Sequence, residues 1–436
     1  MRLPESFIQN YRQILGEEAE AFFTSLEEDS VSAFRTNPLK AGQQHFDQAI
    51  PDTPWGHYGK ISGKSAEHVT GLVYSQEPAA QMVGQAAAPQ KGMKVLDLAA
   101  APGGKSTHLL AYLENTGLLV SNEISVKRSK SLVENIERFG AQNVIVTNES
   151  VRKLAKTFKH YFDLIVLDAP CSGEGMFRKE PDAVRRWHRT LPAEYAKLQK
   201  QILSEAMPML AYGGSLVYST CTWSLEENEE IANWLLRQYD TLNIVNIPKI
   251  NGMTGGIDLP EAARMYPHRF KGEGQFIAKF KDQREKRVFP IRSGSSNLNR
   301  EELALWQEFA AKHLKRPLEG LLQTFGANLY LLPLGLPDLS GLKIARNGLH
   351  LGTFKKKRFE PSFALGLALA QHDVEQSVEI DIEQFKSYAA GNIVFLEGNY
   401  PNGWYQLCVK GNGLGFAKVV NNTVKNYFPK GLRFNA

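Results

Sequence analysis

The chain has 436 residues, of which 43% are hydrophobic and 22% charged, and its formal net charge is +5. These proportions are close to globular averages and exclude a largely disordered chain, and the length predicts roughly three domains. Apolar runs fall short of the roughly 18 residues of a membrane span, the N-terminus lacks an apolar signal core, and three widely spaced cysteines form neither a disulfide framework nor a Cys-x-x-Cys metal pair. We therefore expect a soluble cytoplasmic protein with reduced thiols.

The first part of the chain combines helical and strand patterns. Apolar residues recur at helical spacing between Phe7 and Phe23. The run Phe34-Arg35-Thr36-Asn37-Pro38-Leu39-Lys40 is typical of a short strand that proline stops. We expect a small α+β domain over residues 1–90 and assign it to RNA binding.

Strands and helices alternate over residues 91–282, which predicts an α/β fold with a mainly parallel, Rossmann-like sheet covered by helices on both faces. The expected strands are Lys94–Ala99, Leu118–Glu123, Val144–Thr147, Phe162–Leu167, Ser215–Ser219, Asn243–Ile247 and Gln275–Phe280. The expected helices are Gly104–Tyr112, Val126–Phe139, Ala193–Ala211 and Leu225–Tyr239. In such sheets ligands bind beside the carboxyl ends of the strands.

A linker rich in charge, Ser, Gly and Asn at 281–300 separates this sheet from the C-terminal region. A helix is expected at Arg300–Leu314, followed by short strands between Gly, Pro and Asn turns. We expect an intermediate domain at 283–372 and a second small, strand-rich domain at 373–436. The linker indicates an independent core upstream, so truncation near its end is expected to spare the fold of the sheet.

Basic residues gather in the C-terminal region. Val409–Ala436 holds five basic residues and no acidic one, and Lys355-Lys356-Lys357-Arg358 forms a separate cluster. Such runs are commonly only solvated faces, but both lie beside aromatic residues, such as Phe354 and Tyr427. Basic and aromatic side chains together favour nucleic-acid binding.

A glycine loop follows the first expected strand of the sheet, in Val95-Leu96-Asp97-Leu98-Ala99-Ala100-Ala101-Pro102-Gly103-Gly104-Lys105. Gly103 and Gly104 allow a ligand to approach backbone amides at the positive end of a helix. Glu123 ends the second strand, where a carboxylate accepts hydrogen bonds from a ribose diol. No P-loop string is present, which disfavours a P-loop NTPase. These features predict a nucleotide-type cofactor.

Two further strings each follow a strand and carry a cysteine: Asp168-Ala169-Pro170-Cys171-Ser172-Gly173 and Ser219-Thr220-Cys221-Thr222. If their strands are neighbours, both thiols reach one cleft. The sequence therefore predicts a cofactor combined with a thiol nucleophile. The third cysteine, Cys408, lies between Leu407 and Val409 and is expected in the core. None of the ten histidines stands in a ligand pattern such as His-x-x-x-His, so no metal is expected.

The glycine loop and the two cysteine strings resemble the signature strings of the Sun/RsmF-type RNA (cytosine-5) methyltransferases. Phe34–Lys40 is similar to the N-terminal motif of this family, and Tyr266-Pro267-His268 to the stretch before its last strand. The resemblance covers essentially the whole chain. It implies a class I methyltransferase sheet, S-adenosyl-L-methionine as cofactor, and a C-terminal PUA-like RNA-binding module.

The resemblance also implies roles for individual residues. Cys221 is the nucleophile that adds to carbon 6 of cytosine, Cys171 assists release, and Asp168 holds the amino group and ring nitrogen of the base. Lys105, or the helix expected from Leu225, raises the thiolate fraction. The cofactor site would be formed by Ala99, Ala100, Ala101, Pro102, Gly103, Gly104, Lys105, Glu123, Ser150 and Asp168. Ala99 stands where relatives often have cysteine, and Asn148-Glu149-Ser150 where they place an aspartate for the adenine.

The predicted function is methylation of cytosine carbon 5 in RNA, with ribosomal RNA as the expected partner of a monomeric enzyme and transfer RNA as the alternative. A second hypothesis is a ribosome-assembly protein that binds RNA without catalysis, and a third is a DNA cytosine-5 methyltransferase. A buried thiol requires the base to be unpaired or flipped out of its stack. A basic stretch after Cys171 is expected to hold the flanking RNA backbone, or to be an ordinary basic helix face: Phe177, Arg178, Lys179, Arg185, Arg186 and Trp187.

Overall fold

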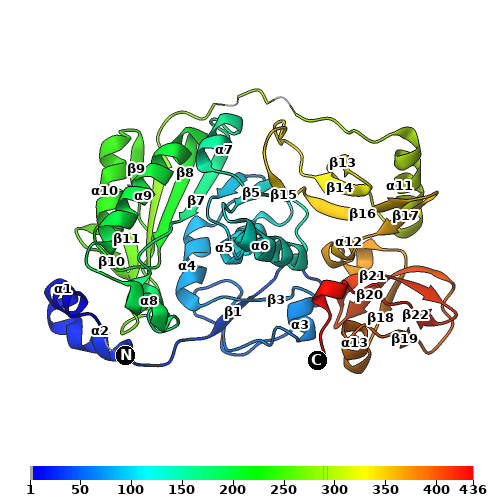
Figure 1. Cartoon of the computed structure of the whole chain (residues 1–436), viewed down its shortest axis with the longest axis horizontal. Helices are drawn as coiled ribbons and strands as arrows, with labels where there is room; N and C mark the ends of the chain where they lie inside the picture. Colours follow the sequence, from blue (N-terminus) through cyan, green and yellow to red (C-terminus); the bar gives the residue numbers. More distant parts are fainter. Residues whose placement is uncertain (1–2, 288, 292, 436) are drawn as a thin grey trace.

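Figure 1 shows the computed structural model, which describes residues 3–287, 289–291 and 293–435. The N-terminal region contains a small antiparallel sheet of order β2-β1-β3. Its elements are α1 (Glu5–Leu15), α2 (Ala19–Ser25), β1 (Ala33–Thr36), β2 (Gly56–Tyr58), α3 (Ala66–Val69) and β3 (Val73–Ser75). This region lies along the lower edge of the central sheet in Figure 1.

The central sheet has the order β10-β11-β12-β8-β7-β4-β5-β6-β15, with β9 paired to β12. Its strands are β4 (Lys94–Asp97), β5 (Leu118–Asn122), β6 (Val144–Thr147), β7 (Phe162–Asp168), β8 (Leu210–Thr220), β9 (Leu242–Val245), β10 (Thr254–Gly256), β11 (Leu259–Met265), β12 (Gln275–Asp282) and β15 (Ile344–Arg346). The strands from β8 to β6 run parallel, and β12 is antiparallel to β8. The strand order reverses between β4 and β7, which is where such sheets open a ligand crevice. The predicted Rossmann-like fold is confirmed.

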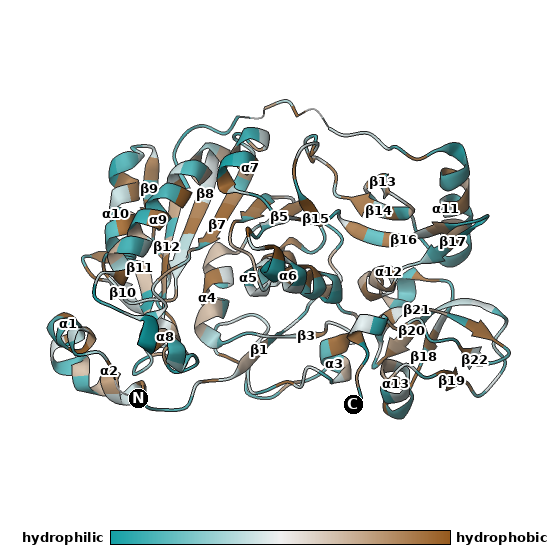
Figure 2. Cartoon of the chain, viewed as in Figure 1, coloured by the Kyte–Doolittle hydropathy of each residue, from teal (hydrophilic) through white to brown (hydrophobic). Residues whose placement is uncertain are grey.

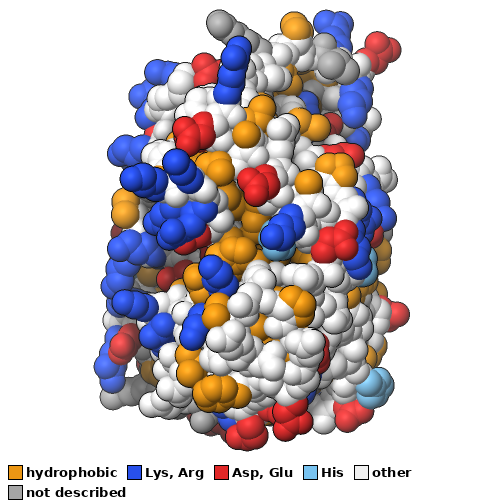
Figure 3. Space-filling model, turned by 90° about the vertical axis from the view of Figure 1, so that its right-hand side faces the viewer, with side chains coloured by type: hydrophobic (Ala, Val, Ile, Leu, Met, Phe, Trp, Pro, Cys, Tyr) orange, Lys and Arg blue, Asp and Glu red, His pale blue; other side chains and the backbone are white. Residues whose placement is uncertain are grey.

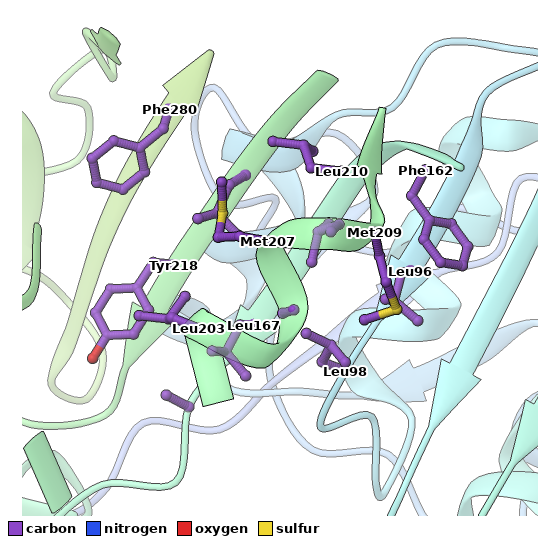
Figure 4. Close-up of a cluster of buried hydrophobic side chains, with 14 of the residues drawn as sticks. Leu96, Leu98, Phe162, Leu167, Leu203, Met207, Met209, Leu210, Tyr218 and Phe280 are labelled. Carbon is purple, nitrogen blue, oxygen red and sulfur yellow. The ribbon is translucent and has the colours of Figure 1, made fainter. Parts of the chain in front are cut away.

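Helices cover both faces of this sheet, because alternate strand residues point to opposite sides. Val95 packs with α4 (Pro78–Ala87), α5 (Gly104–Leu113) and α6 (Val126–Phe139), whereas Leu96 packs with α7 (Val151–Thr157), α9 (Leu191–Ala206) and α10 (Glu229–Gln238). Figure 4 shows Leu96, Leu203 and Phe280 in the second of these clusters. In Figure 2 the sheet strands are largely hydrophobic and the outer helix faces hydrophilic, as a doubly covered sheet requires.

Two helix boundaries differ from the sequence prediction. The helix expected to reach Ala211 ends at Ala206, because Pro208 follows within a short 3-10 turn and cannot continue the hydrogen-bond ladder. The helix expected from Leu225 begins at Glu229. The Asn228 side chain instead accepts from the Thr220 hydroxyl at 2.6 Å and donates to the carbonyl of Thr222 at 2.9 Å. These bonds keep the segment after Cys221 in a turn.

The C-terminal region contains two smaller sheets. The first has the order β13-β14-β16-β17 and follows α11 (Arg300–His313): β13 (Leu321–Phe325), β14 (Asn328–Leu332), β16 (Leu349–Lys355) and β17 (Arg358–Pro361). The second, of order β18-β20-β21-β22-β19, packs with α12 (Phe363–Ala368) and α13 (Ile382–Ala389): β18 (Ser377–Glu379), β19 (Val394–Phe395), β20 (Gly403–Val409), β21 (Asn412–Val420) and β22 (Thr423–Val424). Both match the expected strand-rich character of this region.

The region after the linker is part of the sheet's structure, which corrects the expectation of an independent upstream core. β15 pairs antiparallel with β6, and the Lys343 N–H donates to the Glu149 carboxylate at 2.8 Å. Leu332 and Leu336 are buried in the same cluster as Phe162. Truncation near Arg300 would therefore remove an edge strand and expose apolar core, so it is not expected to spare the fold.

The segment around α3 also contacts the C-terminal region. The Lys64 ammonium donates to the carbonyl of Asn435 at 2.7 Å, and Lys410 pairs with Glu67 at 2.5 Å. The C-terminal cation Lys410 thus has a carboxylate partner from the N-terminal region. Within the described residues, no helix combines the length and apolar character needed to cross a membrane.

Candidate active site

The glycine loop connects β4 to α5 at the carboxyl edge of the sheet. Gly103 caps the helix at φ +116°, a conformation that L side chains rarely adopt. The loop is held from the far side by α6, because Arg128 donates to the Ala101 carbonyl and Asn135 to the Pro102 carbonyl, both at 2.7 Å. The amides at the start of α5 therefore sit in a fixed frame beside the crevice.

Acidic groups line the ends of the two strands beside this loop. Glu123 follows β5, is 2% exposed, and lies 3.5 Å from the Arg128 guanidinium. Asp97 ends β4, is fully buried, and has one carboxylate oxygen without a hydrogen-bond partner while the other accepts from Ser106 at 2.7 Å. Burial raises the pKa of Asp97 to about 7. The aliphatic side chain of Ile124, directly after Glu123, is 73% exposed.

The two predicted thiols meet at the ends of neighbouring parallel strands. Cys171 follows β7 and Cys221 follows β8, and their sulfur atoms are 3.2 Å apart. Both side chains are half-buried. Their loops are also joined through the backbone, since the Gly175 N–H donates to the Cys221 carbonyl at 2.9 Å. The predicted convergence of the two cysteine strings is thus what the structure shows.

An ion pair ties the glycine loop to the thiol edge. The Lys105 ammonium lies 2.6 Å from one carboxylate oxygen of Asp168. The other oxygen accepts from the Ser219 hydroxyl at 2.7 Å and from the Gln275 amide at 3.1 Å. Burial alone would lower the pKa of Lys105, but the charges of Asp168 and Cys221 outweigh it and the net pKa is raised. Lys105 is therefore a permanent cation close to Cys221.

The environment of the two thiols is unequal. The hydrogen bond with Cys221, burial and nearby negative charges raise the pKa of Cys171 well above its ordinary value. Cys171 thus keeps its proton and can donate it in a hydrogen bond to the Cys221 sulfur. Of the two thiols, Cys221 is the one that interacts electrostatically with the Lys105 cation.

A buried carboxylate, Glu174, joins the two thiol loops to the N-terminal helix α1. It lies three residues after Cys171 and accepts from the Thr222 hydroxyl at 2.7 Å and the Trp223 N–H at 3.1 Å. It also accepts from the Tyr11 hydroxyl at 2.5 Å and from the Trp187 indole at 2.9 Å. Donors from three other segments of the chain therefore depend on one carboxylate.

A second carboxylate, Glu227, lies behind the Cys171 loop. It accepts from the Ser172 N–H at 3.0 Å, from the Ser172 hydroxyl, and from Gln199 at 2.9 Å. Burial raises the pKa of Glu227 to about 8. The Ser172 hydroxyl also contacts that of Thr222 at 2.9 Å, so this network again spans both thiol loops.

Some predicted site residues lie elsewhere. Ser150 is exposed at the N-cap of α7 and makes no capping hydrogen bond. Its cofactor role stays a prediction. Leu225 does not begin a helix, so a helix N-terminus at that residue does not act on the thiols. Cys408 is fully buried in β20, as expected of a core residue, and burial raises its pKa to about 12.

The basic stretch after Cys171 is only partly available to a ligand, which corrects the sequence interpretation. The Arg178 side chain is 3% exposed and pairs with Glu273 at 2.9 Å, while also donating to the carbonyl of Ser25. Phe177 and Trp187 are buried against α1 and α2. Phe177, Arg178 and Trp187 thus hold the N-terminal helices. For the two aromatic side chains, burial in this cluster is more favourable than exposure to solvent. The exposed cations are Lys179, Arg185 and Arg186.

Sequence reasoning missed several polar residues of this site. Glu174 follows the cysteine string immediately, and Glu227 follows the second one, so a carboxylate near each string was a usable signal. Gln275 and Arg128 carried no local signal, because their partners Asp168 and Glu123 are supplied by the fold. Among residues 3–287, 289–291 and 293–435, no three His, Cys, Asp or Glu side chains form a group that could hold a metal ion.

Family models match nearly the whole chain in order. Residues 85–281 match the model described as 16S rRNA methyltransferase RsmB/F. Residues 3–78 match the N-terminal domain of 16S rRNA methyltransferase RsmF, residues 308–369 the first C-terminal domain of RsmF rRNA methyltransferase, and residues 375–434 the methyltransferase RsmF PUA domain.

Curated relatives and solved structures agree with these models. The chain is 30% identical to ribosomal RNA small subunit methyltransferase F of Erwinia tasmaniensis over 98% of this chain and 96% of the relative, and 32% identical to that of Shewanella loihica over 87% and 83%. A methyltransferase homologue from Pyrococcus horikoshii has a TM-score of 0.55 at 29% identity, covering 64% of this chain and 95% of its own. NSun6 from the same organism, at 22% identity, has the same fold over 65% of this chain and 99% of its own, with a TM-score of 0.55.

The Gly103 loop, the paired thiols and the Lys105–Asp168 ion pair thus occur in a chain that matches the four family models in order. The chain belongs to the RsmF branch of the RsmB/F family of methyltransferases.

Proposed function

We propose that this protein methylates carbon 5 of a cytosine in ribosomal RNA through a covalent cysteine adduct. The observation that carries the proposal is the pair of half-buried thiols, 3.2 Å apart, beside the Lys105–Asp168 ion pair. Carbon 5 of cytosine is a poor nucleophile and needs activation by addition at carbon 6. A single thiol would suffice for attack, but only a second group explains how the adduct is released.

S-adenosylmethionine is the cofactor of this family, and the residues at the crevice fit it. The backbone amides at the start of α5 stand at the positive end of the helix, and the buried Glu123 suits a ribose diol. The exposed side chain of Ile124 suits the apolar part of such a ligand. When bound, the cofactor supplies an electrophilic methyl group.

Cys221 is the nucleophile in this proposal. Its thiolate forms a bond to carbon 6, which moves electron density to carbon 5 and makes that carbon reactive toward the methyl group. Lys105 stabilises the thiolate before attack, since the two charges influence one another. Asp168, held in place by Lys105 and Ser219, is positioned to hold the polar edge of the base.

Cys171 acts after methylation in this proposal. The proton on carbon 5 must leave before the bond between carbon 6 and the Cys221 sulfur breaks, and the electron pair of the carbon–hydrogen bond then restores the ring double bond. Cys171 lies next to the sulfur that departs. Because its pKa is raised, Cys171 carries a proton, which it donates to the Cys221 sulfur as the bond to carbon 6 breaks, and its own sulfur then accepts the proton from carbon 5.

Support for RNA comes from the relatives' names and from the surface. The Erwinia, Shewanella and Vibrio relatives are named as methyltransferases of the small-subunit ribosomal RNA. Lys355, Lys356 and Lys357 are exposed on the hairpin between β16 and β17. Figure 3 shows Lys and Arg side chains gathered along one side of the C-terminal face of the molecule. Such cations would contact phosphates whatever the base sequence.

The test uses the full chain with methyl-labelled S-adenosylmethionine and small-subunit ribosomal RNA from cells that lack the gene. We expect label in that RNA and a protected cytosine in bisulfite sequencing. Unmodified transfer RNA and duplex DNA serve as parallel substrates. Label only in transfer RNA or DNA would contradict the substrate assignment, and RNA binding without label in any substrate would favour an assembly protein that does not catalyse.

A further inference from the structure

The N-terminal run Phe34–Lys40 has polar side chains that are buried and bonded outside their own sheet. Arg35 is fully buried, and its guanidinium donates to the carbonyl of Gly104 at 2.8 Å and to the Thr107 hydroxyl at 2.9 Å. Its Nε donates to Gln76 at 2.6 Å. Through these bonds, Arg35 joins the N-terminal region to the cofactor loop.

Arg35 lacks the carboxylate that normally accompanies a buried cation. Burial lowers its pKa to about 10, and one terminal nitrogen, Nη1, is buried without a hydrogen-bond partner. A buried charge without a counterion costs free energy, so a function that depends on its position would explain why it lies there. Apart from Gln76, the groups that accept its hydrogen bonds are the Gly104 carbonyl and the Thr107 hydroxyl, both in the first turn of α5.

The packing around Gly104 is tight. A Cβ at this residue would lie 3.0 Å from the amide nitrogen of Gln76, the residue that Arg35 holds. Thr107 accepts from Arg35 and donates to the carbonyl of Gly103 at 2.8 Å. Arg35 therefore holds the Gly104 carbonyl directly, and Thr107 holds the Gly103 carbonyl through both its hydroxyl and its N–H, each at 2.8 Å.

Fixing a carbonyl also fixes the N–H of the next residue, because the peptide group is planar and its C=O and N–H point in opposite directions. The Gly103 carbonyl sets the direction of the Gly104 N–H, and the Gly104 carbonyl sets that of Lys105. Those N–H groups stand at the positive end of α5. The residue after Gly104 also carries the ammonium that pairs with Asp168.

We propose that Arg35, supplied by the N-terminal region, is a positioning residue that holds the glycine loop in its cofactor-binding geometry. The inference rests on the proposed function in that S-adenosylmethionine binds at this loop. The N-terminal region then has a part in cofactor binding in addition to any contact with RNA. Loss of Arg35 would remove a donor from the Gly104 carbonyl and from the Thr107 hydroxyl, so the start of α5 would spend less time in the geometry that binds the cofactor.

Asn37 provides a matched control in the same run. It is 1% exposed and also joins the N-terminal region to the sheet domain, since its amide donates to the carbonyls of Gly71 at 2.9 Å and Phe139 at 2.8 Å. Phe139 is the last residue of α6 and lies outside the cofactor loop. If Arg35 only holds two regions together, removing Asn37 would have the same consequences.

The experiment is isothermal titration calorimetry of the full chain with S-adenosylhomocysteine, together with thermal unfolding of each variant. We expect Arg35→Met to raise the Kd at least about tenfold, because a hydrogen bond from a buried charge contributes on that scale. Thr107→Val, which keeps the side-chain shape and removes the bridging hydroxyl, should raise it by about threefold or more. Asn37→Ala should leave it within about twofold of the wild type while lowering the Tm.

The Arg35 and Thr107 variants test the positioning role, and the wild-type chain tests cofactor binding itself. Wild-type Kd values for Arg35→Met and Thr107→Val would overturn the proposal, as would an increase in Kd for Asn37→Ala equal to that for Arg35→Met at a similar loss of Tm. If Arg35→Met does not fold, Thr107→Val decides alone. A wild-type chain that fails to bind S-adenosylhomocysteine would instead contradict the proposed function itself.

Discussion

The thiols after β7 and β8 and the thiol in β20 show how position in a sheet determines what a cysteine can do. Cys171 and Cys221 lie half-buried at the ends of parallel strands, and the Lys105 cation interacts electrostatically with Cys221. Cys408 lies within a strand of the C-terminal sheet, fully buried, with a pKa raised to about 12 by burial. The strand end leaves room for a substrate and for polar partners, and the strand interior leaves neither.

The largest expected effect is that of Cys221→Ala. We expect methyl transfer to fall by several orders of magnitude, because removal of an essential nucleophile costs about that much in comparable enzymes. Cofactor affinity should stay nearly unchanged, since the thiol belongs to the base side of the cleft. Labelled methyl transfer and calorimetry measure the two properties. Activity above about a tenth of wild type would contradict the assignment.

Cys171→Ala should differ in kind from Cys221→Ala. The variant can still attack and methylate, but it lacks the group that assists release. We expect a covalent protein–RNA complex that survives denaturing electrophoresis, with little free product. Absence of this complex at unchanged turnover would make Cys171 a structural residue, and the contrast with Cys408 would then rest on Cys221 alone.

Glu174→Gln should lower turnover by roughly tenfold or more, since hydrogen bonds that this buried side chain of the Cys171 loop accepts from the Cys221 loop are lost. Adduct trapped during turnover should increase, because the spacing of the thiols depends on this carboxylate. Glu273→Gln is the matched control: Glu273 is equally buried and paired with Arg178, but no thiol-loop side chain depends on it. Equal losses of turnover and equal adduct levels in both variants would point to general destabilisation.

Glu227→Gln should change the pH dependence of stability. The pKa of Glu227 is about 8 in the folded chain against an ordinary value of 4.5. A raised pKa means that the stabilising contribution is present below the ordinary value and lost as the pH rises through 8. The Tm of the wild type should therefore fall relative to that of Glu227→Gln between pH 5 and pH 9. A constant difference across this range would show that Glu227 is charged throughout.

Cys408→Ala should have the smallest effect. Removal of a buried sulfur leaves a small cavity, and we expect a loss of about 1 kcal/mol in the free energy of unfolding. Methyl transfer and adduct formation should match the wild type. If activity fell by more than the amount of folded protein, Cys408 would also contribute to activity. The contrast between Cys408 and the two thiols at strand ends would then not hold.

Local sequence signals predicted the parts of the site that lie within one segment. A glycine loop between a strand and a helix, and a cysteine directly after each of two strands, identified Gly103, Cys171 and Cys221. The prediction that these residues meet in one cleft followed because the carboxyl ends of parallel strands lie at the same edge of the sheet. The same local logic placed Cys408 in the core, where burial of its neighbours Leu407 and Val409 confirms it.

Contacts between distant segments could not be predicted. Tyr11 and Glu174 are separated by 163 positions, and Arg35 and Gly104 by 69, so no spacing rule relates them. The basic stretch after Cys171 shows the converse error. Arginine is a residue type that often binds phosphate. The Arg178 side chain, however, donates to the Glu273 carboxylate, in the segment before β12, and to the Ser25 carbonyl of α2. Charge in a sequence predicts affinity for anions only when the fold leaves it exposed.

The most direct test of the division between the two thiols is to map the covalent adduct with RNA that contains 5-fluorocytidine at the target site. Fluorine cannot leave carbon 5 as a proton does, so release is blocked and the attacking sulfur stays attached. Proteolysis and mass spectrometry then identify the modified peptide. The account predicts an adduct on Cys221 in the wild type and in Cys171→Ala, and none in Cys221→Ala. An adduct on Cys171, or no adduct in any of the three proteins, would contradict it.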